Sequence, residues 1–150
     1  MVFDAETRFA SGPMDFSAGD KLAVHVFTAK GLELARRIAA HTAADIYAPE
    51  TRASDPDTHA FSSLRAHMLV VFRAYRRHVF ISATGIAVRA IAPLLRGKDV
   101  DPAVVVMDQC GKYAVSLIGG HMAGANRLAL HMASVSGGEA VISTATDARC

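Results

Sequence analysis

One strand–helix–strand unit near the end of the chain constrains the fold more than any other feature. An apolar run, Tyr113–Ile118, stops at a Gly-Gly pair and is followed by helix-period residues from 121 to about 136. A second Gly-Gly pair then precedes a short β-rich run at 140–143. This order is typical of a βαβ unit of about 30 residues. Open α/β sheets bind ligands outside the carboxyl ends of their strands, so we expect any site at the glycine-rich and threonine-rich ends of this unit.

The rest of the chain predicts further alternation of strands and helices. Strands are expected at 21–28, 44–48, 78–83, 103–107, 113–118 and 140–143, and helices at about 32–41, 59–76, 84–97 and 121–136. The polar stretch 49–58 is expected to be a loop. Only about five residues separate the strands at 103–107 and 113–118, so this pair should be an antiparallel hairpin. The predicted fold is α/β: a three-layer α/β/α sandwich, mostly parallel, with one antiparallel hairpin.

Length and composition indicate a single domain. The chain has 150 residues, 51% of them hydrophobic and 20% charged, which is enough apolar material for a core and too much for disorder. Residues 1–20 mix Gly, Ser, Pro, Asp and isolated Phe without a period. We therefore expect a flexible N-terminal arm at 1–20 and a domain at 21–150.

Charge and cysteine content narrow the class of protein. The net charge of +2 is too small to indicate a nucleic-acid partner. No apolar run of about 18 residues predicts a transmembrane helix, and no signal-peptide pattern is present. The two cysteines, Cys110 and Cys150, form no CxxC motif and are typical of ordinary thiols in a reducing compartment. These features predict a cytoplasmic protein without a membrane partner.

The glycine turn carries the pattern G-G-x-x-x-G at 119–124. The dinucleotide fingerprint requires G-x-G-x-x-G, and His121 occupies the place of its second glycine, so a nucleotide cofactor is not indicated. The turn could instead offer backbone N–H groups at a helix N-terminus to an anion such as a carboxylate. Tight helix–sheet packing would also require small residues here, and both interpretations remain open.

Several polar residues follow the turns. His121 and Asn126 would lie about 140° apart on a regular helix, so they converge only if His121 belongs to the turn. Thr144, Thr146 and Asp147 end the last strand, where Asp147 could exchange a proton or orient a water, or simply form a cap or turn.

Two further segments carry candidate groups, and no segment indicates a metal site. Thr84–Gly85 has the same ambiguity between cap and site, and Arg89 one turn later could bind a carboxylate. The basic run at 73–78 is typical of the solvated end of a helix.

The seven histidines form no HxxxH pair and the cysteines are not clustered, so we expect no metal site and no cofactor.

Four motifs together resemble one known family. They are G-I-A-V-R at 85–89, K-D-x-D-P-A-V-V-V at 98–106, S-L-I-G-G-H-x-x-G-A-N at 116–126 and T-A-T-D at 144–147. With the segment at 21–38 they resemble the N-terminal region of the CbiG family, the cobalt-precorrin-5A hydrolases of cobalamin biosynthesis. The resemblance runs from Lys21 to the end of the chain.

The resemblance implies a reaction, and the chemistry of that reaction suggests roles for residues in the matched segments. The family opens the δ-lactone of cobalt-precorrin-5A and releases the extruded ring carbon as acetaldehyde, giving cobalt-precorrin-5B. Cobalt is then carried by the tetrapyrrole substrate, and no separate cofactor is implied. Hydrolysis requires an activated water, so His121 or Asp147 is assigned to proton transfer. The residues expected to bind the carboxylate-rich substrate are Thr84, Gly85, Arg89, Lys98, Gly119, Gly120, Asn126, Thr144 and Thr146.

The chain also departs from the family pattern. Family members continue after T-A-T-D into a linker and a C-terminal domain, and this sequence stops at Cys150. Three hypotheses follow: a hydrolase or its N-terminal part, a non-catalytic tetrapyrrole-binding or partner domain of a split enzyme, and a plain assembly domain. The expected partners are the tetrapyrrole and a separate C-terminal-domain protein or another pathway enzyme, and a homo-oligomer is left open.

Overall fold

The computed structural model describes residues 20–145, and the predicted N-terminal arm therefore lies almost entirely outside the described residues. The strands are β1 (Leu22–Val26), β2 (Ala44–Pro49), β3 (Thr58–Phe61), β4 (Arg77–Ile81), β5 (Ala103–Met107), β6 (Tyr113–Ile118) and β7 (Glu139–Val141). The helices are α2 (Ala29–His41), α3 (Leu64–Val71), α4 (Thr84–Ile91), the 3-10 turn η2 (Ala92–Leu94) and α5 (Ala125–Ser136). Among residues 20–145 no helix is long and apolar enough to cross a membrane.

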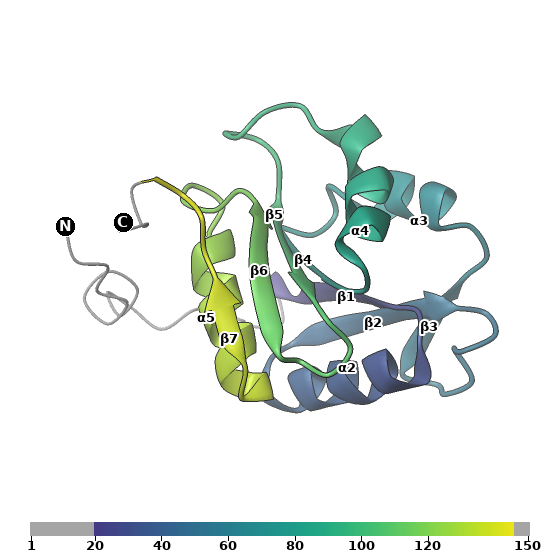
Figure 1. The fold of residues 1–150 in the computed structure, drawn as a ribbon. Helices are drawn as coiled ribbons and strands as arrows, with labels where there is room; N and C mark the ends of the chain where they lie inside the picture. The colour runs from purple at the N-terminus through teal and green to yellow at the C-terminus, as the bar shows by residue number, and fades with distance from the viewer. Residues whose placement is uncertain (1–19, 146–150) are drawn as a thin grey trace.

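The strands form one sheet in the order β3-β2-β1-β4-β5-β6-β7 (Figure 1). All neighbouring pairs are parallel except β5 and β6, which form the predicted antiparallel hairpin. Helices α2 and α5 cover one face of the sheet, and α3 and α4 cover the other. The predicted three-layer, mostly parallel α/β sandwich is confirmed.

The prediction of a helix at 59–76 is wrong at both of its ends. Residues Thr58–Phe61 form β3, which pairs with β2 and buries its two end residues, Thr58 and Phe61. Helix α3 begins only after Ser63, whose Oγ accepts a hydrogen bond from the Ala66 amide at 3.2 Å. Pairing with a neighbouring strand has overridden the local helical pattern here.

Two further helices have shifted ends. The first turn predicted for the helix at 121–136 is irregular, and α5 starts at Ala125 because Gly124 adopts φ +87°. The helix predicted at 84–97 ends at Ile91 and continues as η2, which contains Pro93. Proline lacks the N–H that the regular helix would need at this point.

The two faces of the sheet have separate cores. Between the sheet and α2 and α5 lies an aliphatic core that includes Val24, Ile38 and Leu128. Between the sheet and α3 and α4 lies a core richer in aromatic rings, with Phe72 and Phe80 fully buried. This second core also contains two buried histidines, described below.

Candidate active site

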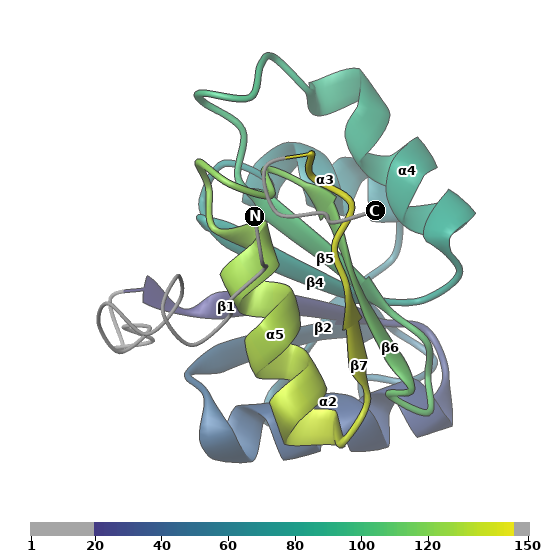
Figure 2. The same cartoon turned by 60° about the vertical axis from the view of Figure 1, so that its left-hand side comes forward.

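The direction of β6 decides which predicted residues can meet. Because β6 is antiparallel to β5 and parallel to β7, the carboxyl ends of β6 and β7 lie at the edge of the sheet that is formed by the amino ends of β4 and β5 (Figure 2). The residues after β6 and β7, Gly119, Gly120 and Thr144, therefore share one edge of the sheet. Thr84, Gly85 and Arg89 follow the carboxyl end of β4 and lie at the opposite edge. The structure thus separates the predicted site residues into two groups.

The glycine turn at 119–124 is closed by backbone hydrogen bonds. Gly119 has φ +71° and Gly124 has φ +87°, values that side chains disfavour. The amides of Ala125 and Asn126, the first two of α5, donate to the carbonyls of Gly119 at 3.0 Å and Gly120 at 2.9 Å. These two N–H groups are therefore engaged within the protein and are not available to an anion.

Close packing excludes any side chain at Gly120. A Cβ there would lie 2.7 Å from Thr144 Cγ2 and 2.8 Å from Asn126 Oδ1. The turn thus brings the residue after β6 into direct contact with the segment after β7. Packing accounts for this glycine, one of the two interpretations that the sequence left open.

Asn126 joins the two strand ends from inside the protein. It is fully buried, and its amide nitrogen Nδ2 donates to Thr144 Oγ1 at 2.9 Å. Its amide oxygen accepts from Ser116 Oγ on β6 at 2.7 Å. An engaged, buried amide of this kind fixes the position of its neighbours. Asn126 therefore holds Thr144 beside the glycine turn instead of facing a ligand.

His121 lies in the turn and is exposed, next to Met122, whose side chain is also exposed. His121 does belong to the turn, which the sequence required for it to approach Asn126, but His121 is exposed whereas Asn126 is buried. Thr146 and Asp147 lie outside the described residues, so their position relative to His121 stays a prediction.

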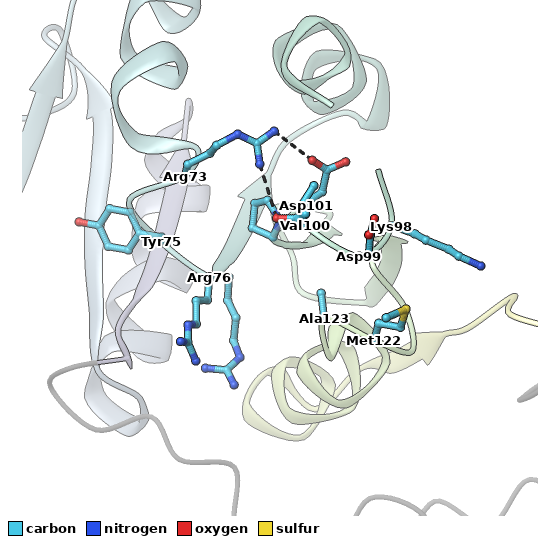
Figure 3. Close-up of a pocket in the computed structure, with 11 residues that line it drawn as sticks. Arg73, Tyr75, Arg76, Lys98, Asp99, Val100, Asp101, Met122 and Ala123 are labelled. Atoms are coloured by element: carbon cyan, nitrogen blue, oxygen red, sulfur yellow. Dashed lines mark hydrogen bonds and ion pairs between the residues drawn. The ribbon is translucent and has the colours of Figure 1, made fainter. Parts of the chain in front are cut away.

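A cationic pocket of about 530 Å³ opens beside the glycine turn (Figure 3). It lies between the residues that link α3 to β4, the loop at 98–102 and the turn residues Met122 and Ala123. Its charged lining residues are Arg73, Arg76, Arg77, Lys98, Asp99 and Asp101. Lys98 was among the predicted binding residues, but the three arginines were not. In the sequence, the only indication of these arginines was the basic run at 73–78. Its position beside the glycine turn depends on the direction of β6.

Two of the pocket cations are paired within the protein. Arg73 Nη2 lies 3.0 Å from Asp101 Oδ1, and Arg77 Nη1 lies 2.5 Å from Asp20 Oδ2. Arg76 and Lys98 form no ion pair with any other residue that the structure describes, and Figure 3 shows Arg76 pointing away from the Arg73–Asp101 pair. The pocket therefore offers two cations to an anionic ligand.

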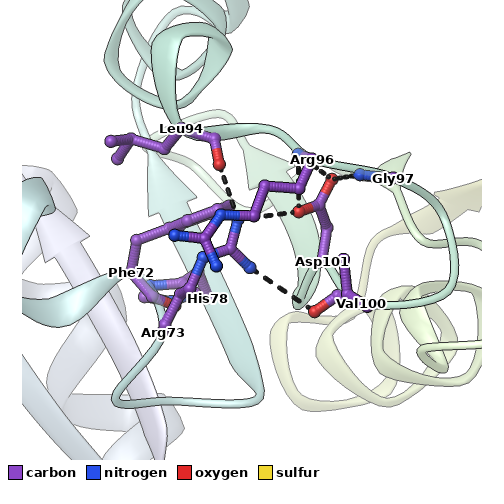
Figure 4. Close-up of polar contacts among 8 residues, drawn as sticks. All are labelled: Phe72, Arg73, His78, Leu94, Arg96, Gly97, Val100 and Asp101. Atoms are coloured by element: carbon purple, nitrogen blue, oxygen red, sulfur yellow. Dashed lines mark hydrogen bonds and ion pairs between the residues drawn. The ribbon is translucent and has the colours of Figure 1, made fainter.

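Asp101 organises the loop that carries Lys98 (Figure 4). Its carboxylate accepts hydrogen bonds from the backbone amides of Arg96 and Gly97 at 3.0–3.1 Å and from Arg73. Burial alone would raise the pKa of Asp101, but these hydrogen bonds outweigh it and hold the pKa below its usual value. The same guanidinium donates to the Leu94 carbonyl at 2.6 Å, which ties the loop to the end of α3.

A chain of three histidines crosses the α3–α4 side of the sheet. His78 Nε2 donates to the Phe72 carbonyl at 2.8 Å, so neutral His78 accepts at Nδ1 from His25 Nε2 at 3.0 Å. His25 Nδ1 in turn accepts from His67 Nε2 at 3.1 Å. Burial lowers the pKa of His25 well below its usual value and that of His78 to about 4.

This histidine chain is a structural network and does not resemble a metal site. Its nitrogens hydrogen-bond to one another, and no group of three His, Cys, Asp or Glu side chains within residues 20–145 is arranged to hold a metal ion. The histidine chain could not be recognised from the sequence, because its members come from three separate elements, β1, α3 and β4.

Comparison with known proteins places this site in a biochemical context. The family "Cobalamin synthesis G N-terminal" matches residues 66–147, which include the glycine turn and both sides of the pocket. A cobalt-precorrin-5A hydrolase from Salmonella typhimurium is 38% identical over 131 residues, which are 85% of this chain and 36% of that protein. A cobalt-precorrin-5A hydrolase from Priestia megaterium is 40% identical over 85 residues, 57% of this chain and 23% of that protein.

A solved structure shares the fold. It is described as that of a cobalamin biosynthesis protein G homolog from Sulfolobus solfataricus, and it superposes with a TM-score of 0.61 at 18% identity. The match covers 83% of this chain and 37% of the other. In all three comparisons the chain spans well under half the length of the protein it matches.

Proposed function

Because this chain belongs to the cobalamin synthesis G N-terminal family, we propose that it is the N-terminal part of a cobalt-precorrin-5A hydrolase. In this proposal it opens the δ-lactone of cobalt-precorrin-5A and releases acetaldehyde to give cobalt-precorrin-5B. The observation that carries the proposal is the meeting of the glycine turn with Thr144 beside a cationic pocket, in a chain 38% identical to a protein of that name.

The pocket suits the chemistry of this substrate. A cobalt-precorrin carries many carboxylates, and Arg76 and Lys98 provide positive charge outside the two ion pairs of the pocket, which Asp99 in the same lining offsets only in part. Asp101 and Arg73 hold the loop of Lys98 in place. The arrangement is therefore formed before a ligand binds, which lowers the entropic cost of binding.

Within the proposal, the strand ends perform the hydrolysis. His121 or Asp147 transfers the proton from the attacking water, and Thr144 and the turn backbone hold the lactone or carboxylate oxygens. Asn126 acts as a positioning residue, since its side chain is buried against Thr144. Thr84, Gly85 and Arg89 lie at the other edge of the sheet and take no part in this site.

The names of the relatives favour a hydrolase over a non-catalytic carrier. We further propose that the protein acts in the cytoplasm and needs no cofactor beyond the cobalt of its substrate. The region that corresponds to the remaining length of the relatives, on this or on another polypeptide, is a proposed partner in the reaction.

The proposal is tested by incubating the purified chain with cobalt-precorrin-5A and measuring acetaldehyde, with and without the remaining part of the Salmonella typhimurium relative. Release by either mixture, reduced about 10²–10⁴-fold by His121→Ala with corrinoid binding retained, is the expected result. Release that His121→Ala leaves unchanged would assign the proton transfer to another residue, with Asp147→Asn as the next variant. Binding of the corrinoid without release in either mixture would favour the carrier hypothesis.

A further inference from the structure

Helices α3 and α4 are apolar on both their inner and outer sides. Their inner residues, such as Met68 and Ile91, are buried in the core. Several of their outer residues are also apolar: Leu69 is 65% exposed, Val70 77% and Val88 42%. A helix that is hydrophobic all round is normally covered on all sides, so this surface has the character of one that another molecule covers.

A groove runs between the two helices, which pack against each other. It has a volume of about 570 Å³ and lies on the outer side of the α3–α4 layer. Its apolar lining consists of Leu64, Leu69, Ile86, Ala90, Pro93 and Leu94. Grooves of this kind between two helices accept the apolar face of a third helix.

The charge around the groove has one sign. Arg65 and Arg89 also line it, and neither forms an ion pair with another residue that the structure describes. From residue 64 to residue 98 the sequence contains six arginines and one lysine but no Asp or Glu. All 14 acidic residues of the chain lie outside this segment.

We propose that the α3–α4 groove is a docking surface for an acidic amphipathic helix of a protein partner. Leucine-like side chains of that helix fill the groove, and carboxylates beside them pair with Arg65 and Arg89. This inference does not depend on the proposed function, because it rests on the apolar outer surface and its charge.

The same observations disfavour two other occupants. A second copy docked through the same face would bring Arg65 and Arg89 against identical arginines, since a two-fold interface is self-complementary. A small carboxylated ligand would fill the groove but would leave Val70 and Val88 uncovered, because neither residue lines it.

The test measures binding of the intact chain to a labelled synthetic helix by fluorescence anisotropy. The helix carries leucines at positions i, i+3, i+4 and i+7 and glutamates on both flanks; a matched helix has lysines in place of the glutamates. We expect saturable binding of the glutamate helix alone. Leu69→Ser should weaken this binding by about tenfold or more, because it removes a central apolar anchor. Arg65→Glu and Arg89→Glu should each weaken it by about tenfold.

A matched charge reversal on the other side of the sheet serves as the control. Lys30→Glu, on the exposed side of α2, changes the net charge equally and should alter binding by less than about twofold. Circular dichroism and thermal melts establish that each variant is folded, as expected for substitutions of exposed side chains.

Three results would overturn the proposal. The first is equal binding of the glutamate and lysine helices, or binding that the groove variants leave unchanged. The second is a dimer of the chain, detected by light scattering without peptide, that Leu69→Ser dissociates. The third is displacement of the helix by cobyrinic acid in proportion to its occupancy, which would make the groove a small-molecule site.

Discussion

The two faces of the sheet bury different kinds of side chain, and the helices that cover them expose different kinds of side chain to the solvent. The face under α2 and α5 is packed with aliphatic residues, and these helices turn charged residues such as Glu33 and Arg36 to the solvent. The face under α3 and α4 buries aromatic rings and the histidine chain, and these helices expose Leu69 and Val70.

The difference separates a face held mainly by apolar packing from one that also buries a chain of hydrogen-bonded histidines. The core under α2 and α5 is stabilised mainly by burial and shape, although Asn126 at the start of α5 is also buried. The α3–α4 face instead depends on hydrogen bonds, and the end of its helix α3 supplies Arg73 to the pocket loop. Polar networks of this kind fix positions closely but respond to pH and to single substitutions.

The largest effect is expected from a mutation that creates a cavity in the aliphatic core. Leu128 on α5 is fully buried in that core. Leu128→Ala should lower the free energy of unfolding by about 3 kcal/mol, because the lost methyl groups leave a cavity. Urea denaturation at neutral pH measures this loss. A loss below about 1 kcal/mol would mean that the α2–α5 face is loosely packed.

The histidine face should respond to acid. His25 and His78 have lowered pKa values, His78 to about 4, so both stay neutral in the folded protein while the unfolded chain binds protons below about pH 6.5. Their contribution to stability is therefore fully present above about pH 6.5 and is lost as the pH falls toward 4. We expect urea denaturation to show a loss of about 2 kcal/mol in the free energy of unfolding between about pH 7 and pH 5.5.

A substitution isolates this pH dependence. His25→Phe keeps an aromatic ring next to Phe80 but removes one titrating group, so the slope of stability against pH should become smaller by the contribution of that group. His131, whose pKa is lowered by burial on the other face, is present in both proteins and cancels in the comparison. His41→Gln, at the end of α2, is the control, because it also removes one histidine but on the other face of the sheet. An unchanged slope in His25→Phe would show that the histidine chain does not control the acid response.

The ion pairs of the two faces should also differ in how much they stabilise the protein, and the pair on the α3–α4 face should stabilise it more. Asp101→Asn removes the charge from a buried carboxylate that holds Arg73 and two backbone amides, and should cost about 1.5 kcal/mol. Arg36→Ala breaks the Arg36–Asp55 pair, in which both side chains are over 40% exposed, and should cost no more than about 0.5 kcal/mol. Thermal unfolding measures both. Equal losses would mean that the pocket loop is no better fixed than the surface of α2.

The smallest effect is expected on the exposed surface of α3. Leu69→Ala deletes the same atoms as Leu128→Ala, but from a side chain that is 65% exposed. The unfolding free energy should change by less than about 0.5 kcal/mol. A loss comparable to that of Leu128→Ala in the same urea titration would show that Leu69 is buried in solution.

Local patterns in the sequence were sufficient for most of the fold. The glycine turns and the two close strands predicted the βαβ unit and the hairpin, and both are confirmed. Strand β3 was missed because its four residues continue into the apolar spacing of α3 and are strand only through pairing with β2. The end of a helix or strand set by tertiary contacts cannot be predicted from propensity alone.

The relative positions of the candidate site residues could be predicted in part, for a reason visible in the topology. Gly120 and Thr144 were expected at one edge, and they touch there. Arg89 was grouped with them, but it follows β4, and the carboxyl ends of β4 and β6 lie at opposite edges. The reason is the antiparallel hairpin of β5 and β6, which the sequence also predicted. Arg76 was overlooked because a basic run at the end of a helix is usually solvated, and only the fold brings it beside the glycine turn.

The most direct test of this account asks which edge of the sheet binds a carboxylated corrinoid. Cobyrinic acid is titrated into the chain and binding is followed by visible absorbance, with its fully esterified form as the control ligand. Arg76→Gln and Lys98→Gln, at the glycine-turn edge, should each weaken binding of the free acid by about tenfold, and Arg89→Gln by less than about twofold. The ester should bind weakly to every variant. If Arg89→Gln weakens binding while Arg76→Gln and Lys98→Gln do not, the site lies at the opposite edge and the account is contradicted.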